Sequence, residues 1–478
     1  MQRRAKIIAT LGPSSSDART IRRILQAGVD IVRLNLSHGS REEHRDLVQR
    51  TRQVAMSLER QVPIMLDLMG PRYRLAEIPE GERRLQPRQQ VTLGSDASAV
   101  DVPIDSPDLL QHLKPGERIL IGDGLLELQI VGRRRHRVAA KVISGGLITS
   151  RKGINLPDSD LPFEISSKDR ADIRLAVEEK VDFLAASYVG CAQNVEAVRR
   201  VVKRARGDLL LVAKLERSRA VDHLEEIVES ADAVMVARGD LGVEVPLHTV
   251  PVLQKRIIDA GCHYGKPVIV ATQMLDSMID NPRPTRAEAS DVANAVFDGA
   301  DALLLTGETA IGKHPVKTVR TMVEIITEAE DYAAKRGSTV RSELLSQAEN
   351  LGGGLPEIAD AVARAAVFTA KHLGVRQIVV FSQSGFTARL IARYRPTVPI
   401  LAFTISEAVA RRVQLLWGVR PLILSEEIKP GSDIVALVER HLKEARLVRR
   451  GESLIILMGQ PIRDRPLTNL MRIHRVSS

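Results

Sequence analysis

The chain has 478 residues, of which 44% are hydrophobic and 27% charged, a composition that is ordinary for a globular protein of about two to four domains and excludes extended disorder. Its formal net charge of +10 favours anionic partners, but aromatic residues make up only 3%, too few to stack nucleic-acid bases. The two cysteines, Cys191 and Cys262, have no metal-binding spacing and no apolar run reaches the roughly 20 residues of a membrane span, so we expect a cytoplasmic protein.

Apolar strands alternate with amphipathic helices along the first 335 residues. The predicted strands are 6–12, 30–37, 63–68, 181–188, 209–216, 233–240, 267–275 and 302–310. The helices predicted between and after them are 15–27, 41–59, 167–179, 193–206, a stretch around 221–228, 250–263, 286–298 and 315–335. Eight strands in this alternation favour a closed (β/α)₈ TIM barrel over an open sheet.

The active site of such a barrel lies at the carboxyl ends of its strands. All eight predicted strands end in polar groups, namely Thr10; Arg33, Asn35 and Ser37; Asp67; Ser187; Lys214 and Glu216; Arg238 and Asp240; Thr272 and Gln273; Thr306 and Glu308. A barrel with only a structural role has no need of polar groups at every strand end. The pattern therefore favours catalysis over a scaffold.

The fifth and sixth strands carry the strongest chemical signal. Side chains along a strand alternate between its faces, so Lys214 and Glu216 should share one side of the fifth strand end, and Arg238 and Asp240 one side of the sixth. Mg²⁺ is held by one or two carboxylates, with waters and substrate oxygens completing its shell. The sequence predicts a divalent-cation site here; the alternative is that these residues are solvated loop charges.

Two further domains are predicted outside the barrel. Residues 70–156 lack helical periodicity and contain the short alternating runs VTLG, RILIGDG, LLELQIV and RVAAKVIS, which predict a small β domain inserted after strand 3, either a lid over the barrel or a structural excursion. Residues 336–478 predict an open α/β domain, leaving 1–69 and 157–335 for the barrel. Its loop SQSGFTA joins a strand to a helix, as an anion site or a plain helix cap.

Stretches spread over the whole chain resemble the pyruvate kinase family. They include KIIATLGPSS at 6–15, IVRLNLSHG at 31–39, LDLMGPRYR at 66–74, SRKGINLP at 150–157, AKLE at 213–216, VARGDLG at 236–242, ATQML at 271–275, PRPTRAEASDVANAVFDGAD at 282–301, GETA at 307–310 and SGFTARLIARYRP at 384–396. The resemblance implies transfer of the phosphoryl group of phosphoenolpyruvate to ADP, giving pyruvate and ATP in the last step of glycolysis. It also implies a homotetramer.

The same resemblance implies roles for single residues. Glu216 and Asp240 would bind Mg²⁺ or Mn²⁺, Lys214 and Arg33 the phosphoryl group, and the backbone at Arg238 and Gly239 the carboxylate, while Thr272 lies where the enolate is protonated. Asn35, His38, Arg74 and Lys152 match positions near ADP, and Asp123 one near a second metal ion. Such an arrangement suits phosphoryl transfer, in which the protein mainly supplies positioning and positive charge.

The potassium site of the family is altered in this sequence. Potassium-dependent members hold the ion between residues matching Asn35, Ser37 and Asp67, followed by a Thr and, four residues later, a Glu. Here these last two positions are Leu68 and Arg72, and Met69 replaces a usual Lys. The pattern resembles members that need no monovalent cation, so we expect Arg72 to substitute for potassium and K⁺ not to be required.

The C-terminal loop is a candidate effector site. Ser382, Ser384, Gly385 and Thr387 could bind the phosphate of an allosteric sugar phosphate or nucleotide. Phe386 stands where some effector-binding members carry a basic residue, which favours a monophosphate over a doubly phosphorylated sugar.

Two other functions remain open from the residues alone. A metal-dependent aldolase or lyase acting on pyruvate enolate could also use a Glu and an Asp at strand ends, although the inserted domain and the C-terminal domain argue against it. A catalytically silent regulatory paralogue should show damage among Lys214, Glu216, Asp240, Arg33 and Thr272, and all five are intact.

Overall fold

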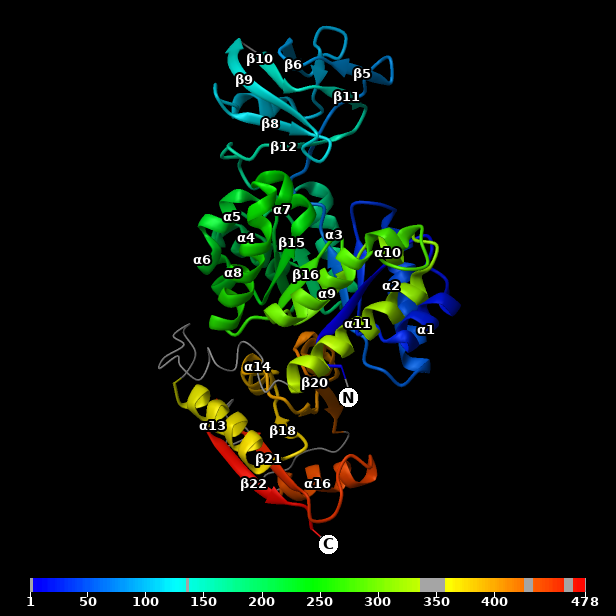
Figure 1. Cartoon of the computed structure of the whole chain (residues 1–478), viewed down its shortest axis with the longest axis vertical. Coiled ribbons are helices and arrows are strands. Elements are labelled where there is room, and N and C mark those ends of the chain that lie inside the picture. The colour runs from blue at the N-terminus through cyan, green and yellow to red at the C-terminus, as the bar shows by residue number, and fades with distance from the viewer. Residues whose placement is uncertain (1–2, 135–136, 336–356, 425–432, 460–466, 478) are drawn as a thin grey trace.

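Three units follow one another along the long axis of the molecule, with the inserted β domain at one end, the barrel in the middle and the C-terminal domain at the other end (Figure 1). The computed structural model describes residues 3–134, 137–335, 357–424, 433–459 and 467–477. The first residues expected for the C-terminal domain, 336–356, lie outside the described residues.

The predicted eight-stranded parallel barrel is confirmed, and it closes in the order β1-β17-β16-β15-β14-β13-β3-β2. Its strands are β1 (Lys6–Leu11), β2 (Ile31–Asn35), β3 (Ile64–Asp67), β13 (Phe183–Ala186), β14 (Leu210–Leu215), β15 (Ala233–Ala237), β16 (Val268–Ala271) and β17 (Ala302–Leu305). The strands are short apolar runs because the barrel interior and the helices bury both of their faces.

Helices surround the barrel on the outside (Figure 1). They are α1 (Ala18–Ala27), α2 (Arg41–Ser57), α3 (Ser167–Glu178), α4 (Ala192–Arg204), α5 (Ser218–Asp222), α6 (Leu224–Ser230), α8 (Val250–His263), α9 (Arg286–Asp298) and α11 (Pro315–Lys335), with the short helices α7 (Arg238–Glu244) and α10 (Gly307–Ala310) directly after strand ends. Capping boxes begin α2 at Ser40 and α9 at Thr285, which explains why these helices start where polar residues precede the apolar pattern.

Four aspartates bind the barrel strands together at their amino ends, which form the floor of the barrel. Each aspartate directly precedes the second strand of a consecutive pair, and its carboxylate accepts a backbone N–H at the start of the first strand of that pair. The pairs are Asp30 with Ile7 at 2.8 Å, Asp182 with Ile64 at 3.0 Å, Asp232 with Leu211 at 2.8 Å and Asp301 with Val268 at 2.9 Å. The barrel is therefore built from four similar strand pairs.

The inserted domain, which we call the lid, contains a seven-stranded sheet in the order β4-β12-β8-β9-β10-β6-β7 and a two-stranded sheet β11-β5. Its strands are β4 (Tyr73–Arg74), β5 (Glu82–Leu85), β6 (Gln90–Gly94), β7 (Val102–Pro103), β8 (Arg118–Ile121), β9 (Leu126–Arg134), β10 (Arg137–Ser144), β11 (Gly146–Thr149) and β12 (Gly153–Asn155), with a 3₁₀ helix η1 (Pro107–Gln111). The four predicted runs correspond to β6, β8, β9 and β10. The other five strands have only two to four residues, too short for a readable alternation.

The C-terminal domain is the predicted open α/β sheet, in the order β20-β19-β18-β21-β22. Its elements are α13 (Glu357–Leu373), β18 (Ile378–Phe381), α14 (Phe386–Arg393), β19 (Ile400–Thr404), α15 (Glu407–Arg412), η4 (Val413–Leu415), β20 (Val419–Ile423), α16 (Ile434–Glu444), β21 (Ser453–Met458) and β22 (Leu470–Arg475). Leu415 packs into the apolar core inside the barrel. Arg395 binds Asp301 at 2.9 Å and Arg411 binds Asp182 at 2.7 Å, so the domain is fixed to the barrel floor.

Within the part of the chain that the structure describes, no helix is both long and apolar enough to cross a membrane.

Candidate active site

Lys214 is the centre of a buried charged cluster at the mouth of the barrel. It lies in β14 with 12% of its side chain exposed, and its ammonium group is 2.6 Å from Glu216 Oε1 and 3.4 Å from Asp67 Oδ1. It also donates to Ser187 Oγ at 2.8 Å. Burial alone would lower the pKa of Lys214, but Asp67 and Glu216 outweigh it and raise that pKa, so the lysine is charged. The predicted convergence of Lys214 and Glu216 is confirmed.

Glu216 has the chemistry of a cation ligand. It is 1% exposed, and its Oε2 accepts the backbone N–H of Tyr188 at 2.7 Å. Burial raises the pKa of Glu216 to about 7; Lys214 opposes this rise and the negative charge of Asp240 adds to it. A divalent cation would offset both the cost of burying the Glu216 carboxylate and its repulsion with Asp240. Among the described residues no group of three or more His, Cys, Asp or Glu could hold a metal ion.

Arg33 and Asp67 form the second half of the cluster. Arg33 donates to Asp67 Oδ2 through Nε at 2.8 Å and through Nη2 at 2.5 Å, and to Thr10 Oγ1 through Nη1 at 2.9 Å. Burial would raise the pKa of Asp67, but Lys214 and Arg33 outweigh burial and hold that pKa below its usual value. The cluster therefore presents two cations whose geometry a buried carboxylate fixes.

The prediction that Arg238 and Asp240 share one face of a strand is wrong. Strand β15 ends at Ala237 and helix α7 begins at Arg238. Successive helical residues are turned by about 100°, so positions two apart point in different directions. The Arg238 side chain binds Asp291 at 2.7 Å and the carbonyl of Thr272 at 2.7 Å, so it is held by the segments after β16.

Thr272 links the end of β16 to the start of α7. Its Oγ1 accepts the N–H of Gly239 at 2.8 Å and donates to the carbonyl of Ala271 at 2.6 Å. Thr272 and Gln273 have φ values of 69° and 53°, in the left-handed region that a branched residue rarely adopts. Such strain is typical of functional sites, where the surrounding structure maintains it.

The residues expected near ADP form two groups, one in the barrel and one in the lid. In the barrel, Asn35 Oδ1 accepts the N–H of Ser37 at 3.1 Å, and His38 is exposed after β2. In the lid, Arg74 on β4 pairs with Gly153 on β12, next to Lys152 in the chain. A Cβ added to Gly122 would lie 3.2 Å from Lys152 Cδ, so Lys152 packs beside the turn that carries Asp123.

Asp67, one of the residues expected at the family's potassium position, has two cationic neighbours. Asp67 contacts both Arg33 and Lys214, as described above. Arg72 is exposed at the start of the lid, and its charge opposes the rise that burial causes in the pKa of Tyr188. Tyr188 in turn donates its backbone N–H to Glu216.

The C-terminal loop satisfies part of its own backbone. Ser382 Oγ accepts the N–H of Gly385 at 3.0 Å and Ser384 Oγ accepts that of Phe386 at 3.4 Å. Thr387 is buried and shares a hydrogen bond of 2.8 Å with Thr468. The N-cap residue of α14 is Gly385, which has no capping side chain, and Ser384 before it is exposed.

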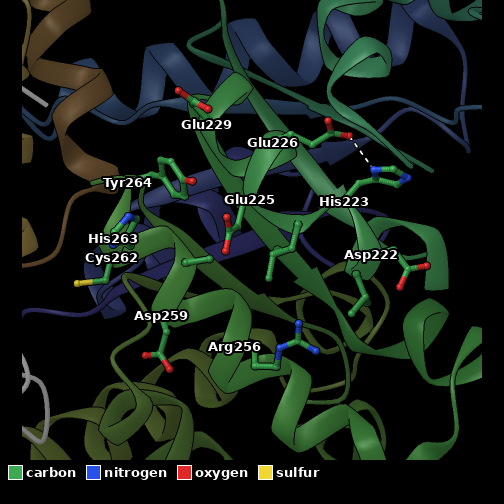
Figure 2. Close-up of a pocket in the computed structure, with 13 residues that line it drawn as sticks. Asp222, His223, Glu225, Glu226, Glu229, Arg256, Asp259, Cys262, His263 and Tyr264 are labelled. Atoms are coloured by element: carbon green, nitrogen blue, oxygen red, sulfur yellow. Dashed lines mark ion pairs between the residues drawn. The ribbon is translucent and has the colours of Figure 1, made fainter. Parts of the chain in front are cut away.

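A hollow of about 960 Å³ lies on the outer wall of the barrel, between α5–α6 and α8. Figure 2 shows its lining, in which Asp222, Glu225, Glu226, Glu229 and Asp259 supply carboxylates. His223 pairs with Glu226 at 3.0 Å. None of the residues predicted for the active site lines this hollow.

Sequence reasoning missed Tyr188 and Glu244 as neighbours of the site. Tyr188 follows the strand-end residue Ser187, so its position was a usable signal. Glu244 is 6% exposed at the end of α7, and its Oε2 has no hydrogen-bond partner. Its nearest bonded neighbour in the lid is 89 residues away in the chain, so no local pattern points to it.

Comparisons with known proteins show which family the chain resembles along its whole length. The family model for the pyruvate kinase barrel domain matches residues 2–319, and that for the pyruvate kinase alpha/beta domain matches residues 360–474. The pyruvate kinase of Geobacillus stearothermophilus is 37% identical over 100% of this chain and 81% of its own length, and that of Sporosarcina psychrophila is 38% identical over 99% and 80%. The crystal structure of a pyruvate kinase from Cryptosporidium parvum superposes with a TM-score of 0.91 at 32% identity, covering 99% of this chain and 96% of that one.

Proposed function

Because the chain belongs to the pyruvate kinase family, we propose that the buried cluster at the barrel mouth is where phosphoenolpyruvate gives its phosphoryl group to ADP. The enzyme is a phosphotransferase of glycolysis whose products are pyruvate and ATP. The observation that carries the residue assignment is the contact of Lys214 Nζ with the buried carboxylates of Glu216 and Asp67.

Glu216 and Asp240 are the proposed ligands of Mg²⁺ or Mn²⁺. When bound, the cation supplies positive charge that neutralises the oxygens of the substrate. Lys214 keeps one Glu216 oxygen in place and Tyr188 the other. The Glu216 carboxylate is thereby oriented before the substrate arrives.

Lys214 and Arg33 are proposed to bind the phosphoryl group during transfer. The transition state of phosphoryl transfer is loose and spreads negative charge over the equatorial oxygens, so two fixed cations stabilise it more than they stabilise the bound substrate. The Asp67 carboxylate holds Arg33 by two hydrogen bonds, which reduces reorganisation during the reaction.

Thr272 and the start of α7 are proposed to serve the pyruvate half of the substrate. The backbone at Arg238 and Gly239 would hold the carboxylate, in place of the present bond from the Gly239 N–H to Thr272. The released Thr272 hydroxyl could then hold the proton that the enolate receives, through a water.

The nucleotide is proposed to bind between the barrel and the lid. Asn35 and His38 would contact ADP from the barrel, Arg74 and Lys152 from the lid, with Asp123 near a second metal ion. Support comes from the pairing of Arg74 on β4 with Gly153 on β12, the residue that follows Lys152. Closure of the lid would bring the two groups together and exclude water.

The remaining assignments extend the proposal beyond the active site. Arg72 would replace potassium at the positions of Asn35, Ser37 and Asp67, and the exposed part of the 382–387 loop would bind a phosphorylated effector. The proposed domains are 1–69 with 157–335, 70–156, and 336–478. A homotetramer is proposed from family resemblance alone, and a cytoplasmic location is proposed from the resemblance together with the two free cysteines.

A coupled assay that follows pyruvate formation tests the proposal. The wild-type chain should be active with phosphoenolpyruvate, ADP and Mg²⁺ without K⁺. This activity should disappear in Glu216→Gln and in Asp240→Asn. Full activity of both variants at limiting Mg²⁺ would refute the metal-ligand assignment.

A further inference from the structure

The segment through which the chain returns from the lid to the barrel is bound to the barrel residues that follow Glu216. We call this segment, residues 155–162, the return strap. The hydroxyl of Ser218 donates to the carbonyl of Pro157 at 3.0 Å, and Arg217 Nη2 donates to the carbonyl of Ser159 at 3.4 Å. Arg219 forms an ion pair with Asp160. The strap is therefore attached to the loop that presents one proposed metal ligand.

The strap is also attached to the helix that presents the other proposed ligand. Asn155, at the start of the strap, donates its Nδ2 to Glu244 Oε1 at 3.3 Å. Glu244 is the last residue of α7, and Asp240 lies in the first turn of the same short helix. Because a helix of two turns moves as a rigid body, a displacement of Glu244 displaces Asp240 as well.

The Glu244 carboxylate is only partly satisfied in this position. It is 6% exposed, and its Oε2 has no hydrogen-bond partner in the structure. A cavity of about 20 Å³ adjoins it, lined among others by Tyr73, Tyr188, Asn155 and Arg217. That volume suffices for one water molecule, and these polar groups are partners a buried water requires.

Arg217 is the nearby cation that stabilises the charged form of Glu244. Burial raises the pKa of Glu244 and the negative charge of Asp240 adds to this rise, whereas Arg217 and hydrogen bonding from Asn155 and the Ser218 backbone oppose it. Arg217 is the residue next to Glu216 in the chain, so the charge that stabilises the Glu244 carboxylate comes from the other metal-binding segment. The wall of the small cavity also includes Tyr188, whose N–H is bound by Glu216.

We infer that Glu244 is a positioning residue that couples the return strap of the lid to the pair Glu216 and Asp240, so that closure of the lid and binding of the divalent cation strengthen each other. The inference rests on the proposed metal ligands. If Asp240 and Glu216 held one cation, a shift of Asp240 on binding would be carried along α7 to Glu244 and, through its bond with Asn155, to the strap. Thermodynamic reciprocity then requires that a closed lid tighten cation binding by the same factor.

The test measures lid position directly rather than turnover. Spin labels are attached at Val131→Cys in the lid and Ile311→Cys in the barrel, both exposed positions, in a chain carrying Cys191→Ser and Cys262→Ser. The distance between the labels is followed during a Mg²⁺ titration at saturating phosphoenolpyruvate without ADP, so that no phosphoryl transfer occurs. In this background Mg²⁺ should shift the distance distribution with a defined midpoint.

Glu244→Ala and Asn155→Ala should each raise the Mg²⁺ midpoint at least about tenfold, equivalent to about 1.4 kcal/mol of coupling. The matched control is Glu330→Ala, since Glu330 is also 6% exposed but binds the backbone of Arg4 and Ala5 near the barrel floor. Its midpoint should stay within about twofold of the parent chain. In activity assays the apparent KM for Mg²⁺ should rise more than kcat falls.

A wild-type midpoint in both Glu244→Ala and Asn155→Ala would overturn the inference. If Glu244→Ala does not fold, Asn155→Ala decides alone, because it removes the same bond from the lid side. Glu216→Gln separates the two proposals. An unchanged Mg²⁺ midpoint in Glu216→Gln refutes the metal ligands and the coupling together. If Glu216→Gln loses the Mg²⁺ response while Glu244→Ala and Asn155→Ala keep the wild-type midpoint, only the coupling is refuted.

Discussion

Replacing Lys214 by methionine tests the electrostatic basis of the reaction most directly. The substitution removes one of two cations in a cluster where the lysine is only 12% exposed and contacts oxygens of Glu216, Asp67 and Ser187. A unit charge about 4 Å from a developing negative charge contributes about 4 kcal/mol at an effective dielectric constant of about 20. Part of this interaction is also made with bound substrate. We therefore expect a loss of about 2.7–4 kcal/mol from the transition state, or about 10²- to 10³-fold in kcat.

The assay is steady-state pyruvate formation at saturating phosphoenolpyruvate, ADP and Mg²⁺, so that weaker metal binding does not disguise the chemical step. Lys6→Met is the matched control, because Lys6 is also a buried lysine on a barrel strand and donates to the carbonyl of Val419 at 2.6 Å. It lies at the opposite end of the barrel, so its loss should reduce stability and leave kcat within about twofold of wild type. A Lys214→Met enzyme with kcat within about threefold of wild type would show that the lysine does not stabilise the transferring group.

The wild-type enzyme should be fully active in tetramethylammonium buffer without K⁺, because Arg72 is permanently charged. The double variant Leu68→Thr, Arg72→Glu should become partly dependent on K⁺. A tenfold rise in wild-type activity on adding K⁺, equivalent to about 1.4 kcal/mol of barrier, would contradict this. Ser384→Glu should abolish the response to a phosphorylated effector in titrations of activity, since its carboxylate repels phosphate, and an unchanged response would place the effector site elsewhere. Burial lowers the pKa of Lys6 from 10.5 to about 8, so between these values the unfolded chain binds more protons and the free energy of unfolding of the wild type should rise with pH relative to Lys6→Met. Urea titrations on both sides of this window check it, and a pH-independent difference would argue against a neutral Lys6.

The barrel could be predicted from the sequence because its signal is local. Each strand is a short apolar run followed by an amphipathic helix, and helices such as α8 and α9 were predicted with their observed bounds. The start of α7 was not predicted because RGDLG continues an apolar strand without a capping serine or threonine. Because of this missed boundary, Arg238 and Asp240 were expected on one face of a strand, whereas they lie in a helix and point in different directions.

The candidate site was predictable only where its residues are close in the chain. Lys214 and Glu216 share a strand face two residues apart, so the period of the strand brought them together. The contacts of Arg33 with Asp67 and of Lys214 with Ser187 span 34 and 27 residues and depend on closure of the barrel. Glu244 depends on the path of the lid, which no local pattern describes.

The floor aspartates give the barrel an unusual tolerance of interruption. The second of the four strand pairs, β3 with β13, is split by the whole lid, yet Asp182 and Ile64 meet across 118 residues of chain just as the uninterrupted pairs do. The inserted chain leaves and re-enters at the mouth of the barrel, whereas the bond between Asp182 and Ile64, which joins β3 and β13, lies at the barrel floor. The length of chain inserted at this junction therefore changes what stands above the proposed catalytic groups, while the bond between Asp182 and Ile64 at the opposite end stays the same.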